Sequence, residues 1–146
     1  MTKRVLIVED EIFVALEIEQ IVAEVGLEVS AIAADQAAAL EAAGESDIAL
    51  IDLNLRDGLT GASIGQALAA QYGVRVIYVT ANPSQIGGAS VAAMGVIAKP
   101  FRGATIRAAL TLAASENPVA EMPDITGFTP FLPRPGGASQ GQGYIG

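Results

Sequence analysis

Several chemically active side chains follow directly after short apolar runs of the sequence. Glu9 and Asp10 follow the first run, Asp52 ends the third, and Thr80 and Lys99 end two later ones. If each run is a strand of one parallel sheet, ligands bind beyond the carboxyl ends of those strands. We therefore expect these five side chains to meet at one edge of the sheet.

This set of side chains suits phosphoryl transfer. Glu9, Asp10 and Asp52 would crowd carboxylates together, which is costly unless a cation neutralises them. Oxygen ligands suit Mg²⁺, and a metal beside Asp52 would make its carboxylate a usable nucleophile towards a phosphoryl group. Thr80 would donate a hydrogen bond to one phosphoryl oxygen, and Lys99 would pair with another.

Each residue also has an ordinary structural interpretation. Asp52 alone could cap the connection after its strand, and Glu11 fits the first turn of the following helix, where the helix dipole favours acids. Thr80 could start a turn, and Lys99 could be a solvated surface lysine. The chemical interpretation is favoured because the groups occur together, each at the end of a run.

The composition excludes other kinds of chemistry. The chain has 146 residues, no cysteine and no histidine, so disulfides, thiolate metal sites and histidine-based nucleophile arrangements are excluded. Its net charge of −8 disfavours nucleic-acid binding. No apolar run approaches the roughly 20 residues of a membrane span. We expect a cytoplasmic protein that binds neither nucleic acid nor membranes.

Short apolar runs alternate with helical patterns over residues 1–114, which we expect to form one domain. Strands are expected over 4–8, 28–33, 48–52, 74–80 and 96–99. Helices are expected over 11–25, 35–43, 62–72, 84–94 and 102–114, the fourth weakened by Gly87 and Gly88. This alternation predicts an α/β fold with a doubly wound, five-stranded parallel sheet, flavodoxin-like with strand order 2-1-3-4-5.

Residues 115–146 differ in character and are expected to form a mostly irregular tail. Five of the seven prolines lie there, and such composition favours disorder. Four apolar residues nevertheless fall within eight positions, namely Ile125, Phe128, Phe131 and Leu132. An extended segment with such anchors could dock on a sheet edge or groove of its own domain, of a second copy or of a kinase. Both interpretations of the tail stay open at this point.

The sequence resembles the receiver domain of two-component response regulators over about residues 3–114. The matching stretches are VLIVEDE (5–11), IALIDLNLRDG (48–58), VIYVTA (76–81) and IAKPF (97–101). The variants DLNLRDG and TAN look most like receivers of alphaproteobacterial stress and light-kinase systems.

The resemblance implies a role for each site residue. Asp52 matches the phospho-acceptor, Thr80 the switch hydroxyl and Lys99 the lysine that pairs with the phosphoryl group. Residues Glu9, Asp10, Asp52 and Asn54 match the metal-binding positions, Asn54 through its backbone carbonyl. Pro100 matches a proline that usually follows a cis peptide bond.

One position departs from the family pattern. Many receivers carry Tyr or Phe three residues before the lysine, where this chain has Val96. Tyr78 could substitute for that aromatic switch residue, although an aromatic residue of the core is the simpler interpretation.

These observations predict a single-domain response regulator without an output domain of its own. A histidine kinase or histidine phosphotransfer protein would donate the phosphoryl group, Mg²⁺ would be the cofactor, and a downstream protein target would be the partner. The chain would be no enzyme beyond its own phosphorylation and dephosphorylation, and a homodimer is one expected assembly. The alternatives are a receiver module of a hybrid kinase, or a phosphate sink or scaffold.

Overall fold

The computed structural model describes residues 2–116 and 124–131. Its strands are β1 (Arg4–Val8), β2 (Glu28–Ala33), β3 (Ile48–Ile51), β4 (Arg75–Thr80), β5 (Ala93–Ala98) and β6 (Phe128–Pro130). Its α-helices are α1 (Ile12–Glu24), α2 (Gln36–Ala42), α3 (Gly61–Tyr72) and α4 (Gly103–Ala114). Three short 3₁₀ helices are η1 (Ala43–Glu45), η2 (Pro83–Gln85) and η3 (Gly87–Ala92).

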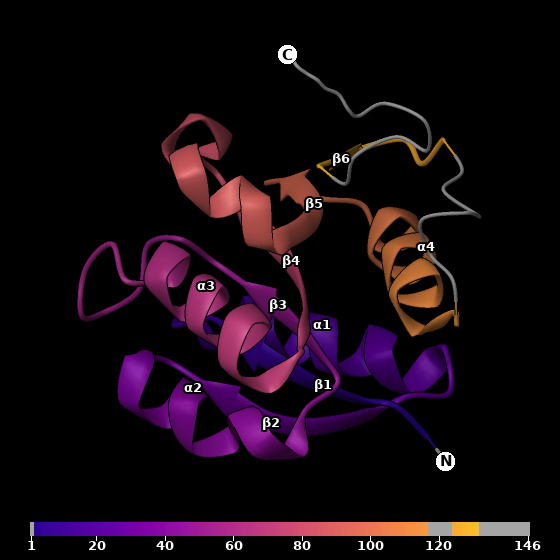
Figure 1. Cartoon of the computed structure of the whole chain (residues 1–146). Coiled ribbons are helices and arrows are strands. Elements are labelled where there is room, and N and C mark those ends of the chain that lie inside the picture. The colour runs from indigo at the N-terminus through magenta and orange to yellow at the C-terminus, as the bar shows by residue number, and fades with distance from the viewer. Residues whose placement is uncertain (1, 117–123, 132–146) are drawn as a thin grey trace.

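The strands form one sheet in the order β2-β1-β3-β4-β5-β6 (Figure 1). The first five strands are parallel to their neighbours, and β6 pairs antiparallel with β5. The predicted order 2-1-3-4-5 is therefore confirmed, whereas the predicted number of five strands is wrong. The sixth strand comes from the segment that the sequence presented as a tail.

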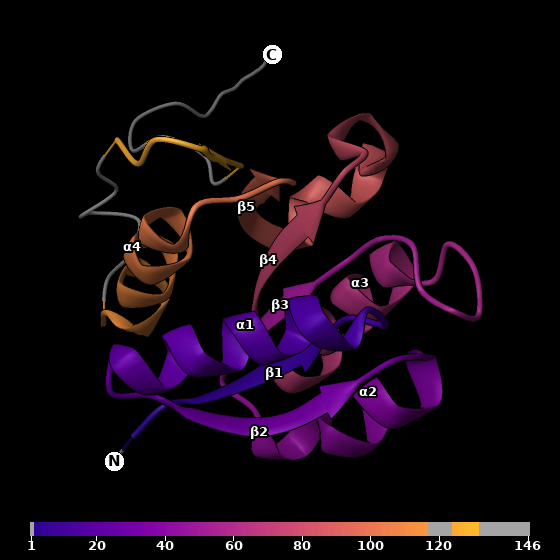
Figure 2. The same ribbon diagram turned by 180° about the vertical axis from the view of Figure 1, so that it is seen from behind.

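Helices cover both faces of the sheet. Helices α1 and α4 lie together on one face, and α2 and α3 lie on the other (Figures 1 and 2). Two separate hydrophobic clusters fill the spaces between the sheet and these helix pairs. The structure is thus the three-layered arrangement that alternating parallel strands and helices require.

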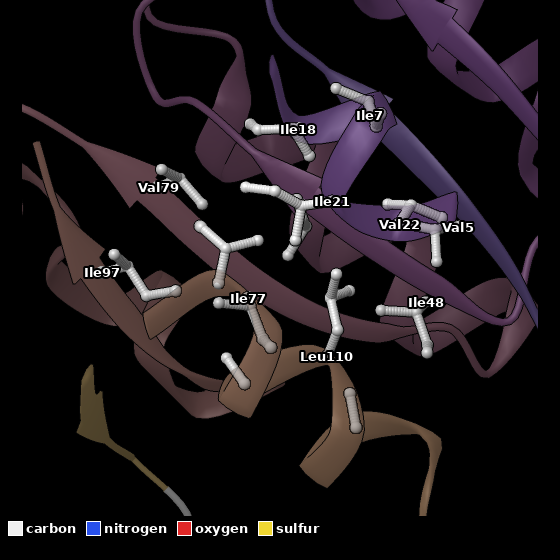
Figure 3. Packing of buried hydrophobic residues seen from close by; sticks show 14 of the residues in the cluster. Val5, Ile7, Ile18, Ile21, Val22, Ile48, Ile77, Val79, Ile97 and Leu110 are labelled. Atoms are coloured by element: carbon white, nitrogen blue, oxygen red, sulfur yellow. The ribbon is translucent and has the colours of Figure 1, made fainter. Parts of the chain in front are cut away.

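The central strands β1 and β3 are almost wholly apolar because both of their faces are buried. In β1, Val5 and Ile7 point into the cluster beneath α1 and α4, while Leu6 and Val8 point into the opposite cluster. All four side chains are fully buried. Figure 3 shows Ile7 beside Ile18 and Val5 beside Val22 of α1, in the same cluster as Ile21 and as Leu110 of α4. The two cores fix the sheet, which in turn fixes where its strands end.

The connection between β4 and β5 differs from the sequence-based prediction. A helix was expected over residues 84–94, but the chain forms η2 and η3, and β5 begins at Ala93. Gly87 adopts a positive φ of 53° next to a second glycine, and paired glycines lower helix stability. Met94 is buried against the sheet, so residues that fit a helical pattern serve as the start of a strand.

Residues 124–131 pack against the domain, as the docking interpretation of the tail expected. Phe128 is buried, and Ile125 and Phe131 pack against the two clusters. The backbone N–H of Phe131 donates to the carbonyl of Met94 at 2.8 Å. Leu132 and the rest of the expected irregular tail lie outside the described residues, and the boundary at residue 114 stays a prediction.

Candidate phosphorylation site

The four predicted strand ends meet at one edge of the sheet. Ladder hydrogen bonds continue one residue past each strand: Glu9 N–H donates to Ala33 O, Asp52 N–H to Val8 O, and Lys99 N–H to Thr80 O, each at 2.9 Å. These bonds hold the backbone of each functional residue at a set height above the neighbouring strand. The side chains beyond the strand ends therefore converge without help from flexible loops.

Lys99 lies at the centre of this site. Its Nζ donates to Glu9 Oε1 at 2.8 Å and to Asp52 Oδ2 at 2.9 Å, and it lies 3.7 Å from Glu11 Oε1. Burial would lower the pKa of Lys99, but the hydrogen bonds to Glu9 and Asp52 outweigh it and raise that pKa. The amine is therefore a fixed positive charge beside Asp52.

Glu9 is the most buried acid of the site, with 2% of its side chain exposed. Burial raises the pKa of Glu9, and its hydrogen bond with Lys99 partly opposes that increase. Its second oxygen accepts the backbone N–H of Glu11 at 3.2 Å. Glu9 is thus held in one position, where a nearby cation favours its charged form.

One ligand oxygen each from Glu9, Asp10 and Asp52 lies within 4.8 Å of the others. Asp10 is exposed, while Glu9 and Asp52 are buried. Three carboxylates at this spacing repel one another unless a cation lies between them, and hard oxygen ligands with open positions for water fit Mg²⁺. The donor set therefore fits the predicted ion, which would neutralise charge on a phosphoryl oxygen.

Asn54 and Thr80 are the remaining predicted site residues. The backbone N–H of Asn54 donates to Asp52 Oδ1 at 3.3 Å, so the turn after β3 folds back over the carboxylate. Thr80 is fully buried at the end of β4, and its hydroxyl accepts the N–H of Asn82 at 3.1 Å. Thr80 is therefore tied to its own turn in this state, and the structure shows no direct bond from it to Asp52 among the described residues.

Tyr78 is a core residue, as the simpler interpretation held. Its ring is fully buried in the cluster beneath α2 and α3, next to Val96 across the β4–β5 pair. Its hydroxyl lies 3.4 Å from the carbonyl of Ala62. Val96 itself is 6% exposed, so the family's aromatic position holds an aliphatic core residue here. The Lys99–Pro100 bond is cis, as the resemblance implied.

The sequence reasoning missed two polar contacts around the site. The side-chain amide of Asn54 donates to Gln85 Oε1 at 3.2 Å, which links the turn after β3 to η2. Arg56 forms an ion pair with Asp35 at 2.8 Å across the neighbouring loops. Both contacts join residues more than 20 positions apart, and no local pattern marks them.

Comparison with known proteins identifies the family. A model of the response regulator receiver domain matches residues 5–111. The chain belongs to this family. Its fold, strand order and acidic cluster agree with membership, and the receiver is a component of two-component systems.

Several proteins similar to this chain are PhyR-type regulators. The chain is 32% identical to the phyllosphere-induced regulator PhyR of Methylorubrum extorquens over 117 residues, which cover 77% of this chain and 44% of that protein. The receiver domain of PhyR from Erythrobacter litoralis superposes with a TM-score of 0.71 at 30% identity, covering 77% of this chain and 89% of that one.

Two further solved structures, one of a whole PhyR protein and one of a receiver domain, are also similar to this chain. PhyR from Brucella abortus gives a TM-score of 0.66 at 28% identity, covering 76% of this chain and 47% of that one. A CheY-like receiver from Methanospirillum hungatei gives 0.68 at 25% identity, covering 76% and 92%. The chain thus spans about half the length of the whole PhyR proteins. It covers about nine-tenths of the two structures that contain a receiver domain alone.

Proposed function

We propose that this receiver accepts a phosphoryl group on Asp52 from a phosphohistidine of a kinase or phosphotransfer protein. The observation that carries the proposal is the pairing of Asp52 with the Lys99 amine inside the acidic cluster. An Asp52 oxygen would attack phosphorus, the bond from phosphorus to the donor nitrogen would break, and the leaving imidazole would take a proton from solvent. Such transfer depends mainly on positioning and charge stabilisation.

The chain's own residues would each perform one task in this transfer. Lys99 would move from sharing its protons between Glu9 and Asp52 to pairing with a phosphoryl oxygen. Thr80 would exchange its bond with Asn82 for one to another phosphoryl oxygen. Glu9, Asp10, Asp52 and the carbonyl of Asn54 would hold Mg²⁺. Beyond this self-modification we propose no enzymatic activity.

An exposed apolar surface beside the site supports a protein donor. Phe13 is 85% exposed on the first turn of α1, with Ile12 at 55% and Leu16 at 45%. Val14 on the same helix lines a groove of about 340 Å³ that also includes Lys99 and Phe101. Exposed apolar patches of this kind mark protein contacts, and this patch would place a donor histidine near Asp52.

Acetyl phosphate with Mg²⁺ provides the direct test, because it replaces the donor protein. Intact-mass measurement should show one added phosphoryl group on the wild-type chain and none on Asp52→Asn. Asp57→Asn removes a neighbouring exposed acid of the same loop and serves as the matched control. Phosphorylation of the Asp52→Asn variant to the wild-type level would overturn the assignment.

A second function is favoured by the partial coverage of the PhyR relatives. Two PhyR structures from Bartonella quintana are described as anti-anti-sigma factors, so a receiver like this one can serve a longer regulator that acts on another protein. We propose a downstream protein target for this chain too, or return of phosphate to a phosphotransfer protein as a sink. Mixing the chain, phosphorylated with a radioactive phosphoryl group, with a phosphotransfer protein separates the two functions. Movement of the radioactive group to the phosphotransfer protein supports a phosphate sink, and its retention on Asp52 supports a downstream protein target.

Action in the cytoplasm without an attached output domain stays a prediction. None of the helices within the described residues is long and apolar enough to cross a membrane.

A further inference from the structure

The outer edge of β5 carries a notch that β6 fills. A Cβ atom on Gly95 would lie 2.6 Å from two ring atoms of Phe128 and would overlap the backbone oxygen of Thr129. The three atoms nearest to such a Cβ all belong to β6. Glycine weakens a strand unless another backbone approaches closely. The absence of a side chain at Gly95 therefore leaves room at the edge of β5 for the aromatic ring of Phe128.

The turn that leads into β6 is also fitted to the domain. The buried hydroxyl of Thr105 on α4 donates to the carbonyl of Thr126 at 2.7 Å. Gly127 follows with a φ of +89°, and a Cβ there would lie 3.0 Å from the same hydroxyl. This positive φ favours glycine. The two contacts place Phe128 opposite Ile97 in the β5–β6 register.

Side chains of segment 124–131 pack against the hydrophobic clusters on both faces of the sheet, beside β5. Phe128 and Ile125 pack into the cluster beneath α1 and α4, while Phe131 packs against the cluster beneath α2 and α3. The backbone bond from Phe131 to Met94 closes the far end. The edge of β5 thus accommodates an extended chain with two aromatic anchors and a small residue before the first.

We propose that this edge of β5 is a docking site for an extended segment of a partner protein, and that β6 is the occupant supplied by the chain itself. The partner segment would add antiparallel to β5, place an aromatic side chain over Gly95 and offer a backbone carbonyl to Thr105. Strand addition of this kind draws affinity from main-chain bonds and selectivity from side-chain pockets.

Two features make β6 exchangeable. It has three residues, and its last residue, Pro130, has no N–H to donate. It is also the terminal strand of the sheet, so it can leave without breaking another pair. Lys99 of the site follows directly after the last residue of β5. A segment docked on β5 would therefore contact the strand that positions this lysine.

The test uses the full chain and a labelled peptide of residues 124–131, with unphosphorylated protein so that it does not depend on Asp52 chemistry. Phe128→Ser removes the anchor of β6, and Gly127→Val disrupts the turn without removing a core side chain. Both variants should bind the peptide at least tenfold more tightly than wild type by fluorescence anisotropy. A tenfold gain corresponds to a wild-type site that β6 covers about 90% of the time.

Adding Gly95→Ala to Gly127→Val should abolish that gain, because the new methyl group fills the notch. Gly44→Ala, at a glycine with open space around it, should leave the gain intact. Equal peptide binding by wild type and both opened variants would overturn the proposal, and so would retention of binding after Gly95→Ala. Light scattering that shows dimers of the opened variants would assign the site to a second copy instead of a partner protein.

Discussion

The Lys99 amine lies 2.8 Å from a Glu9 oxygen and 2.9 Å from an Asp52 oxygen, so one cation joins carboxylates from two different strands. Glu9 and Asp52 lie 90 and 47 positions before Lys99 in the sequence. The pairing gives two buried acids at one edge of the sheet a shared positive partner, which both would lose if the amine were removed.

Lys99→Met should destabilise the metal-free chain by about 3 kcal/mol, the usual cost of breaking a buried ion pair from one side. Addition of Mg²⁺ should restore part of the loss, because a cation among the carboxylates replaces the missing charge. Urea unfolding with and without Mg²⁺ measures both effects. Lys3→Met, at an exposed lysine, is the control; an equal loss there would show that Lys99 has no special role.

Asp10→Ala should weaken both Mg²⁺ binding and phosphorylation by acetyl phosphate. Asp10 is the exposed member of the acidic cluster, so its removal deletes a ligand without opening the core. Mg²⁺ should raise the melting temperature of wild type and of Glu41→Ala, a control at an exposed acid on α2, but not that of Asp10→Ala. An unchanged response of Asp10→Ala would remove this residue from the ligand set.

Thr80→Ala should leave Asp52 able to accept a phosphoryl group but should weaken the response of the rest of the domain. The hydroxyl contacts Asn82 in the present state, and a new contact made only after phosphorylation would shift the equilibrium between two states. Amide hydrogen exchange over residues 81–95, with and without acetyl phosphate, reports that shift. The same phosphate-dependent change in wild type and variant would argue against a switch at Thr80.

Gly65→Ala should destabilise the fold, although alanine normally favours a helix by about 1 kcal/mol. A Cβ at Gly65 would lie 2.8 Å from Cζ of the buried Tyr78 and closer still to its hydroxyl, and overpacking of this kind costs about 1–3 kcal/mol. The same substitution should cost less in a Tyr78→Phe background. A double-mutant cycle by chemical unfolding tests this, and additive costs would show that the two side chains do not interact.

Stability should fall at alkaline pH because burial raises the pKa of Tyr78 from 10.0 to about 12. The unfolded chain loses the phenol proton first, so the free energy of unfolding is unaffected by this group below pH 10. It should then decrease between pH 10 and about 12, by about 1.4 kcal/mol per pH unit. Unfolding curves of wild type and Tyr78→Phe across this range should diverge, and parallel curves would contradict the effect.

The parts predicted from the sequence are those in which local pattern and burial agree. The runs at β1 and β4 are apolar on both faces, so they could only be central strands, and the acids and lysine at the strand ends followed from that. The start of β5 could not be predicted, because Ala93 and Gly95 carry little strand preference and gain their place from β4 and β6. Strand β6 contains a proline and has three residues, so the sequence indicated at most an extended docked segment, and its pairing with β5 makes it a strand.

The direction of β6 has a practical consequence for labelling the protein. Because β6 runs antiparallel to β5, Phe131 lies beside Met94, near the amino-terminal end of β5. Asp52 follows the carboxyl-terminal end of β3, which is the opposite edge of the sheet. A fluorophore attached at the exposed position of Pro130, next to this contact, would lie on the side of the molecule remote from the phosphoryl donor and leave the approach to Asp52 open.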